Sequence, residues 1–204
     1  MRQILFYGDS NTYGYDPADY VNQRYPKASR WTSILQENTG AHWKVIAEGM
    51  NGRKLADLPY GRGWLEQLLA YLEEDDWFAV MLGTNDLLLT GRPDADAACA
   101  SMDRFLEFIT DRRDASGILV IAPPYAGSCD AGDPLYEKVY RENLKMNEEF
   151  ERLADAYGTE FVNAGEWHVG MSSDLVHISK AGHRTFAEKM TEVLAGLQAG
   201  PETV

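Results

Sequence analysis

Short apolar runs alternate with stretches of helical spacing along most of this chain of 204 residues. Turn-forming residues bound the apolar runs, which cover 3–7, 43–48, 77–82, 117–122 and 159–163. Runs of this kind are typical of strands that are buried on both faces of a parallel sheet. Because helical stretches separate the strands, the pattern predicts an α/β fold with a doubly wound, five-stranded parallel sheet and right-handed crossovers.

The stretches between these runs begin and end as helices do. Asp133 is a good N-cap before a proline, Ser179 is a candidate cap, and Gly158 is a typical C-terminal stop. We expect long helices over 95–109, 134–157 and 179–197, and shorter ones near 29–38 and 63–74. We see no internal repeat or linker, so we expect a single domain over 1–204. The longest irregular segment, 16–28, is expected to wall a pocket, to mediate a subunit contact or to be a plain surface loop.

Charge and cysteine usage argue against several classes of partner. The 19 basic residues face 32 acidic ones, for a formal net charge of -13. Nucleic-acid binding needs clustered Lys and Arg, and an anionic membrane would be repelled, so a neutral or cationic small molecule fits better. There is no signal-peptide segment and no long transmembrane stretch, and Cys99 and Cys129 form no redox motif. These observations favour a cytoplasmic protein with free thiols, although a secreted protein without its leader would look the same.

Polar residues follow four of the predicted strands. Ser10 comes after the first strand, in Gly-Asp-Ser-Asn-Thr, and Gly52 follows the second. Asn85 follows the third, in Gly-Thr-Asn-Asp, and Asp174 and His177 lie beyond the fifth. Since ligands of doubly wound sheets bind beyond the carboxyl ends of the strands, we expect these residues to converge at one edge.

The residue types at this edge are those that acyl transfer requires. A serine hydroxyl is a poor nucleophile until a base removes its proton, and His177 can serve Ser10 in that way. Asp174 can accept the other ring N–H and stabilise the imidazolium. The backbone N–H groups of Ser10 and Gly52 and the side-chain amide of Asn85 can bind the oxyanion of the tetrahedral intermediate. We therefore predict Ser10, Asp174 and His177 as a catalytic triad, and Ser10, Gly52 and Asn85 as the oxyanion hole.

In their order along the chain, these blocks resemble those of the SGNH hydrolase superfamily, also called GDSL-type esterases and lipases. The four name-giving residues correspond to Ser10, Gly52, Asn85 and His177, and the blocks span nearly the whole chain. The resemblance implies a flavodoxin-like, three-layer α/β/α fold and ester hydrolysis that needs no cofactor.

Further segments look like the arylesterase and acyltransferase branch of that superfamily, namely Arg30-Trp31-Thr32, Glu48-Gly49, 81–86 and Ala122-Pro123-Pro124. Asn11 stands where the commonest family motif has leucine, which makes the floor beside the nucleophile more polar and argues against a long-chain lipid substrate. The other candidates for the pocket are Met50, Asn51 and Tyr125. The resemblance to this branch also raises the expectation of a homo-oligomer.

The leading hypothesis is a serine esterase that cleaves small, short-acyl carboxylic esters through an acyl-enzyme, with transfer of the acyl group to an alcohol as a variant. A carbohydrate acetyl esterase is the nearest alternative. A non-catalytic flavodoxin-like module that binds a nucleotide or flavin is an alternative of another class, but both glycine-rich phosphate-binding patterns are missing. A metal site of Asp174, His177, His183 and His168 matches no specific zinc spacing, so we expect no metal, and the family resemblance implies no cofactor.

Overall fold

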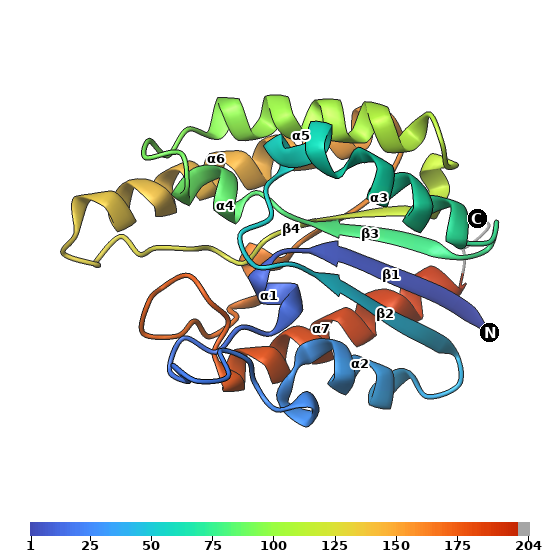
Figure 1. Cartoon of the computed structure of the whole chain (residues 1–204), viewed down its shortest axis with the longest axis horizontal. Coiled ribbons are helices and arrows are strands. Elements are labelled where there is room, and N and C mark those ends of the chain that lie inside the picture. The colour runs from blue at the N-terminus through green and yellow to red at the C-terminus, as the bar shows by residue number, and fades with distance from the viewer. Residues whose placement is uncertain (200–204) are drawn as a thin grey trace.

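The computed structural model describes residues 1–199 and contains one five-stranded parallel sheet (Figure 1). The order of the strands is β2-β1-β3-β4-β5, which reverses direction between β1 and β3. The strands are β1 (Arg2–Gly8), β2 (Trp43–Gly49), β3 (Trp77–Met81), β4 (Ile118–Ala122) and β5 (Glu160–Asn163). All five predicted strands are confirmed, and the predicted ends differ from the observed ones by at most one residue.

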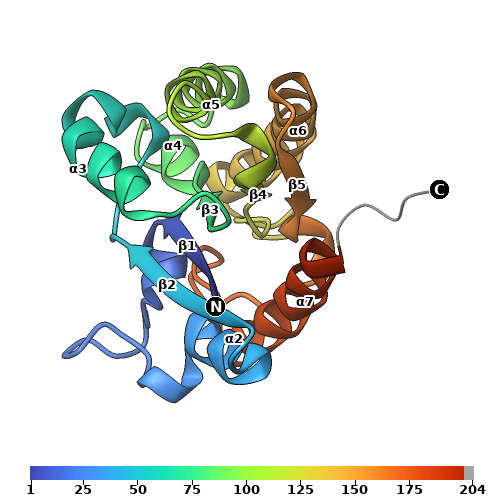
Figure 2. The ribbon, with the colours of Figure 1, turned by 90° about the vertical axis from the view of Figure 1, so that its right-hand side faces the viewer.

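Helices cover both faces of the sheet, which gives the three layers that were predicted (Figure 2). One face carries α2 (Trp31–Thr39) and α7 (Lys180–Ala199). The other face carries α3 (Leu58–Tyr71), α5 (Ala95–Thr110) and α6 (Pro134–Tyr157). Two short helices, α1 (Ser10–Tyr13) and α4 (Thr84–Leu88), follow β1 and β3, and single 3-10 turns span 27–29, 55–57, 115–117 and 164–167.

The shorter helices differ from the sequence expectations. The helix expected near 63–74 spans Leu58–Tyr71, because Pro59 is tolerated in its first turn, where a proline needs no hydrogen-bonding N–H. The helix expected near 29–38 begins only at Trp31, after a separate 3-10 turn. The helices α1 and α4 were not predicted, since four or five residues are too few to show a helical period.

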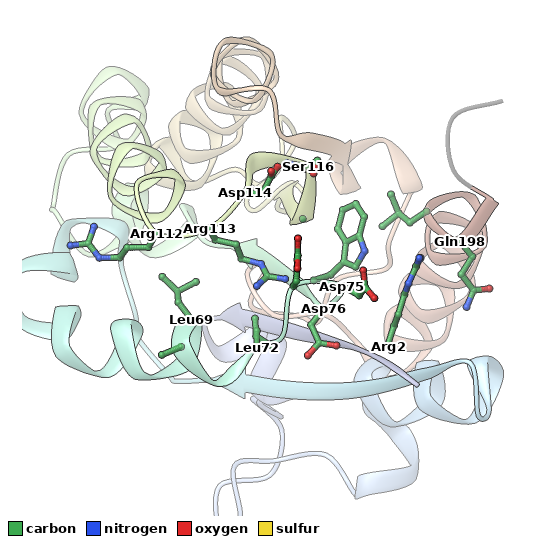
Figure 3. Close-up of a pocket in the computed structure, with 15 residues that line it drawn as sticks. Arg2, Leu69, Leu72, Asp75, Asp76, Arg112, Arg113, Asp114, Ser116 and Gln198 are labelled. Atoms are coloured by element: carbon green, nitrogen blue, oxygen red, sulfur yellow. Dashed lines mark hydrogen bonds between the residues drawn. The ribbon is translucent and has the colours of Figure 1, made fainter. Parts of the chain in front are cut away.

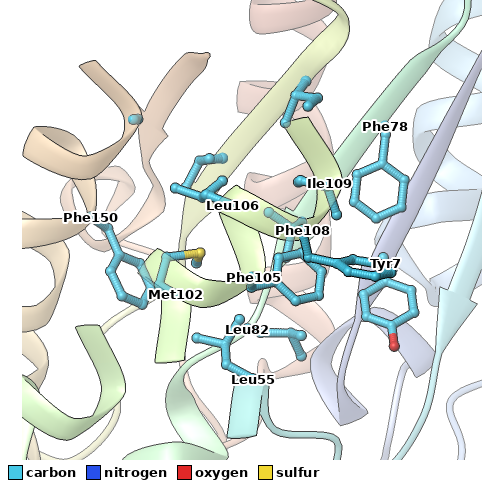
Figure 4. Close-up of a cluster of buried hydrophobic side chains, with 14 of the residues drawn as sticks. Tyr7, Leu55, Phe78, Leu82, Met102, Phe105, Leu106, Phe108, Ile109 and Phe150 are labelled. Carbon is cyan, nitrogen blue, oxygen red and sulfur yellow. The ribbon is translucent and has the colours of Figure 1, made fainter. Parts of the chain in front are cut away.

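Alternate residues of the three central strands, β1, β3 and β4, enter different cores, which explains the unbroken apolar runs 4–7, 78–81 and 118–122. Leu5 and Tyr7 pack with the helices α3, α5 and α6, where Tyr7 stacks on Phe105 at 5.9 Å between ring centroids (Figure 4). Ile4 and Phe6 pack on the opposite face with α2 and α7. Because side chains of a strand point alternately to its two faces, a sheet covered on both faces needs apolar residues at every position.

Two expectations concern cysteines and membrane spans. Cys99 is buried, Cys129 is exposed, and both are free thiols, as expected. Within residues 1–199, no helix combines the length and the apolar character that crossing a membrane requires.

His183, on α7, joins that helix to the start of α2. Its imidazole is 1% exposed, and its Nδ1 accepts the backbone N–H of Trp31 at 3.3 Å. The ring of Tyr25 packs edge-on against it, with 5.1 Å between centroids. Burial, together with the charge of Arg30, lowers the pKa of His183 to about 4. A neutral histidine therefore holds these two helices together.

We expect His183 to make the fold less stable in acid. The unfolded chain takes up this proton near pH 6.5 and the folded chain only near pH 4, so the stabilising contribution is complete above pH 6.5 and is lost as the pH falls toward 4. The shift corresponds to ~3 kcal/mol. Denaturant titrations should show the free energy of unfolding of the wild type falling toward that of His183→Asn, which does not titrate. If the difference in free energy of unfolding between the wild type and His183→Asn stayed constant with pH, this expectation would be wrong.

Candidate active site

Ser10 lies at the carboxyl end of β1, where the chain turns at once into α1. Asp9 caps this one-turn helix, since its carboxylate accepts the N–H of Asn11 at 2.9 Å. Gly14 ends the helix in the left-handed conformation, at φ 84°. The turn from strand to helix leaves the Ser10 side chain at the sheet edge, only 6% exposed.

The structure brings Ser10, His177 and Asp174 together, although the serine and the histidine are 167 residues apart in the sequence. Ser10 Oγ lies 3.0 Å from His177 Nε2. On the other side of the ring, His177 Nδ1 lies 2.6 Å from Asp174 Oδ2. The second carboxylate oxygen, Oδ1, accepts the N–H groups of Val176 and His177, each at 3.0 Å. The three side chains therefore form a continuous chain of hydrogen bonds.

The Asp174 carboxylate stays ionised in this setting. Partial burial alone would raise its pKa, but the hydrogen bonds from the His177 ring and from the two backbone N–H groups outweigh burial and lower the pKa below its ordinary value. An ionised carboxylate can orient the imidazole and stabilise its protonated form. The turn between the two residues is strained, because Leu175 lies at φ 58°, a left-handed conformation that non-glycine residues rarely adopt.

Two tyrosines of the segment 13–28 contact the segment that carries His177. The ring of Tyr15 packs on the His177 imidazole at 4.5 Å between centroids, and the hydroxyl of Tyr25 lies 3.4 Å from Ser172 Oγ. In Figure 1 the two loops, coloured blue and orange, lie side by side at the carboxyl edge. Of these two tyrosines only Tyr25 belongs to the segment 16–28, and the role of that segment stays a prediction.

The predicted oxyanion donors also lie at this edge. Gly52 adopts φ +77°, and a side chain there would meet open space. Within residues 1–199, the N–H groups of Ser10 and Gly52 have no hydrogen-bond acceptor. Asn85 is 7% exposed, and its Nδ2 donates to the carbonyl of Arg53 at 3.1 Å and lies 3.4 Å from Asp9 Oδ2. The two backbone donors are thus free for a ligand, and the amide of Asn85 is held in a defined orientation.

Arg53, which the sequence did not single out, is a buried cation beneath this site. Its guanidinium is hydrogen-bonded to the carbonyl oxygens of Gly8 and Glu48, and it stacks on the ring of Tyr7 at 3.9 Å. It thereby joins the ends of β1 and β2. In the sequence, the one indication that Arg53 belongs to the site is its position directly after Gly52, near the end of a strand.

Two buried carboxylates, those of Asp9 and Asp86, lie near Ser10. Burial, helped by the nearby charge of Asp86, raises the pKa of Asp9 to about 7, although the N–H of Asn11 and the charge of Arg53 oppose the shift. Asp86 accepts the N–H groups of Leu55 and Ala56 at 3.0 and 3.1 Å, and burial raises its pKa as well. Both residues hold backbone segments in place, and neither contacts the Ser10 hydroxyl.

The remaining pocket candidates have different surroundings. Asn11 is 4% exposed, and its amide is hydrogen-bonded to the backbone of 176–178, so it is not an open polar floor. Met50 and Asn51 are exposed at the end of β2. Tyr125 lines a separate cavity of about 330 Å³ that also contains Tyr140 and His168.

Another cavity lies away from Ser10. It measures about 740 Å³ and is lined by the segment before β3 and the one before β4, at the amino ends of the strands (Figure 3). Two of its charged residues are engaged within the fold, since Arg113 donates to the carbonyl of Glu73 and Asp76 accepts from Gln3. Ser10 therefore lies at the opposite end of the sheet.

Nowhere in residues 1–199 do three or more His, Cys, Asp or Glu side chains form a group that could hold a metal ion.

The chain is similar to known proteins over most of its length. Residues 6–185 match the model of the GDSL-like lipase/acylhydrolase family. Est24, a carbohydrate acetylesterase from Sinorhizobium meliloti, is similar in structure with a TM-score of 0.79 and 26% identity, over 97% of this chain and 100% of that one. The aryl esterase of M. smegmatis shares the fold, with a TM-score of 0.79 and 24% identity over 97% of this chain and 100% of that chain. No curated protein matches this sequence. Because the family match covers most of the chain, this protein belongs to the GDSL-like lipase/acylhydrolase family and is an enzyme that hydrolyses esters.

Proposed function

We propose that this protein is a serine esterase that cleaves small, short-acyl carboxylic esters through an acyl-enzyme on Ser10. The observation that carries the proposal is the continuous pair of contacts from Ser10 Oγ to His177 Nε2 at 3.0 Å and from His177 Nδ1 to Asp174 at 2.6 Å. A nucleophile within reach of a base, with that base held by a third group, is the arrangement that covalent acyl transfer requires.

Each group has a defined part in the reaction. His177 Nε2 takes the Ser10 proton while Oγ attacks the ester carbonyl, and Asp174 stabilises the imidazolium that forms. The negative oxygen of the tetrahedral intermediate faces the N–H groups of Ser10 and Gly52 and the amide of Asn85. His177 then gives its proton to the departing alcohol, which leaves an acyl group on Ser10. Water, activated by the same histidine, hydrolyses that ester; an alcohol in place of water would give acyl transfer.

Short acyl groups are favoured over long ones. Ser10 is only 6% exposed, and it lines neither of the two cavities described above. A long alkyl chain needs extended apolar surface, which binds it by about 0.8 kcal/mol per buried methylene group. Acetylated carbohydrates are the second candidate, supported by the similarity to the Sinorhizobium meliloti acetylesterase.

A series of p-nitrophenyl esters tests this proposal. We expect kcat/KM to be highest for the acetate and to fall as the acyl chain lengthens to octanoate, with a mass increase of one acetyl group on the enzyme during turnover. Release of acetate from acetylated xylo-oligosaccharides, measured in parallel, decides between an aryl and a carbohydrate substrate. Higher kcat/KM for octanoate than for acetate would contradict the short-acyl assignment.

Replacing Asn85 with alanine should weaken stabilisation of the oxyanion. We expect kcat for a short acetyl ester to fall by on the order of 10²- to 10³-fold, as is usual when one oxyanion donor is lost. Asn38→Ala is the matched control, because that amide is exposed on α2 and bonds to Thr191 far from the site. Steady-state kinetics with equal turnover in Asn85→Ala and wild type would exclude Asn85 as an oxyanion donor.

A further inference from the structure

The turn that carries His177 is joined to α1 by a second contact, separate from the Ser10–His177 pair. Asn11 follows Ser10 directly, and its side chain reaches the backbone on both sides of the histidine. Its Nδ2 donates to the carbonyl oxygen of Val176 at 3.2 Å, and its Oδ1 accepts the N–H of Ile178 at 2.8 Å. This pair of hydrogen bonds, here called the Asn11 bridge, therefore engages both peptide groups that flank His177.

Asn11 is itself held at its backbone. Its N–H donates to the Asp9 carboxylate at 2.9 Å, and its carbonyl accepts the indole N–H of Trp31 at 3.0 Å. The residue is 4% exposed, so its hydrogen bonds are shielded from water. With all its polar groups bonded, the side chain transmits the position of α1, and hence of Ser10, to the turn that it binds.

The turn needs such restraint because its backbone is strained. Leu175 lies at φ 58° between Asp174 and His177, a conformation that persists only where neighbouring groups impose it. At the start of the turn, the N–H of Gly127 donates to the carbonyl oxygen of Leu175 at 2.7 Å. The Asn11 bridge and Gly127 thus hold opposite ends of the segment 175–178.

We propose that Asn11 is a positioning residue for His177. Through the Asn11 bridge it sets the separation between the His177 ring and the Ser10 hydroxyl, while it touches neither the substrate nor the reacting atoms. This inference rests on the proposed function, since the separation matters only if the histidine activates the serine. It also gives Asn11 a different role from that of a polar pocket floor.

The leucine variant tests the proposal, because Asn11→Leu keeps a branched side chain of similar size and can form neither hydrogen bond of the bridge. We expect kcat for a short acetyl ester to fall about 10- to 100-fold, the usual effect of displacing a catalytic group by about 1 Å. KM should stay within about twofold of the wild-type value, because the bridge does not contact the substrate. If the leucine variant does not fold, Asn11→Ala, which leaves room for water, provides the same measurement.

Gln36→Leu is the matched control for a general loss of stability. The Gln36 amide also bonds to backbone groups, those of Gly40, Trp43 and Val45, but at the amino end of β2, away from the site. We expect this variant to have a lower Tm and unchanged kcat. An equal loss of kcat in Gln36→Leu, or a kcat within about twofold of wild type in Asn11→Leu, would overturn the proposal.

A measurement without substrate separates this inference from the proposed function. In protein labelled with ¹⁵N-histidine, the ring nitrogen signals of His177 should shift in Asn11→Leu and stay in place in Gln36→Leu. Unshifted His177 signals in Asn11→Leu would overturn the positioning role. Shifted signals in a protein whose Ser10→Ala variant retains full activity would uphold the Asn11 bridge and reject the esterase mechanism.

Discussion

Replacement of Ser10 by alanine is expected to lower kcat/KM for a short acetyl ester by at least ~10³-fold, the scale on which loss of a triad nucleophile acts. The reason is that the first covalent step has no second hydroxyl in the same contact with a base. Ser10 Oγ is 3.0 Å from His177 Nε2, and no other serine or threonine oxygen in residues 1–199 forms a hydrogen bond with that nitrogen. The remaining rate would come from the oxyanion donors and from substrate binding.

Ser173→Ala is the control for this substitution. Ser173 is exposed in the turn just before Asp174, so it lies near the triad without a hydrogen bond to it. We expect its kcat/KM and its Tm to match those of the wild type. Near-wild-type activity in Ser10→Ala, measured with protein of unchanged Tm, would mean that another group is the nucleophile.

Replacement of His177 by alanine should lower kcat by at least ~10²-fold, the usual contribution of a general base. Without the imidazole, the Ser10 hydroxyl keeps its proton at neutral pH, and the departing alcohol has no acid to protonate it. Because the ring is partly buried and packs on Tyr15, its removal leaves a space that exogenous imidazole can enter. We expect added imidazole to restore part of the rate in His177→Ala.

His42→Ala provides the comparison, since His42 is exposed between α2 and β2 and faces no part of the site. Its turnover should equal that of the wild type, with no response to imidazole. Steady-state kinetics on the two variants decide the matter: equal turnover in both would remove His177 from the mechanism.

The parts of the fold that were predicted correctly are those in which local and tertiary forces agree. The strand Arg2–Gly8 is apolar over residues 4–7 because both of its faces are buried there, and that pattern is visible in the sequence. The helix Pro134–Tyr157 has a capping Asp133 that accepts the N–H of Leu135 and a left-handed Gly158 at its end. By contrast, α1 and α4 form where the chain leaves a strand. Helices this short show no hydrophobic period in the sequence.

The convergence of Ser10, Asp174 and His177 at one edge of the sheet was predictable because these residues follow strand ends. Their supporting contacts were not, since each depends on tertiary proximity. Asn143 and Asn147 illustrate this: both are fully buried on α6, where they bond to each other and to the loop after β4 through the N–H of Ala126 and the carbonyl of Pro123. The sequence shows two amides four residues apart on an otherwise apolar helix face. This pattern indicates a buried hydrogen-bond network, but it does not reveal which loop the network holds.

The most direct test of Ser10 as the nucleophile is covalent labelling with a fluorophosphonate, read by intact mass and by peptide mapping. Wild-type protein should gain one adduct, located on Ser10, while Ser10→Ala gains none and Ser173→Ala labels like the wild type. His177→Ala should label far more slowly, because the hydroxyl is no longer activated. A single adduct that persists in Ser10→Ala, or that maps to a residue away from the carboxyl edge of the sheet, would contradict the mechanism.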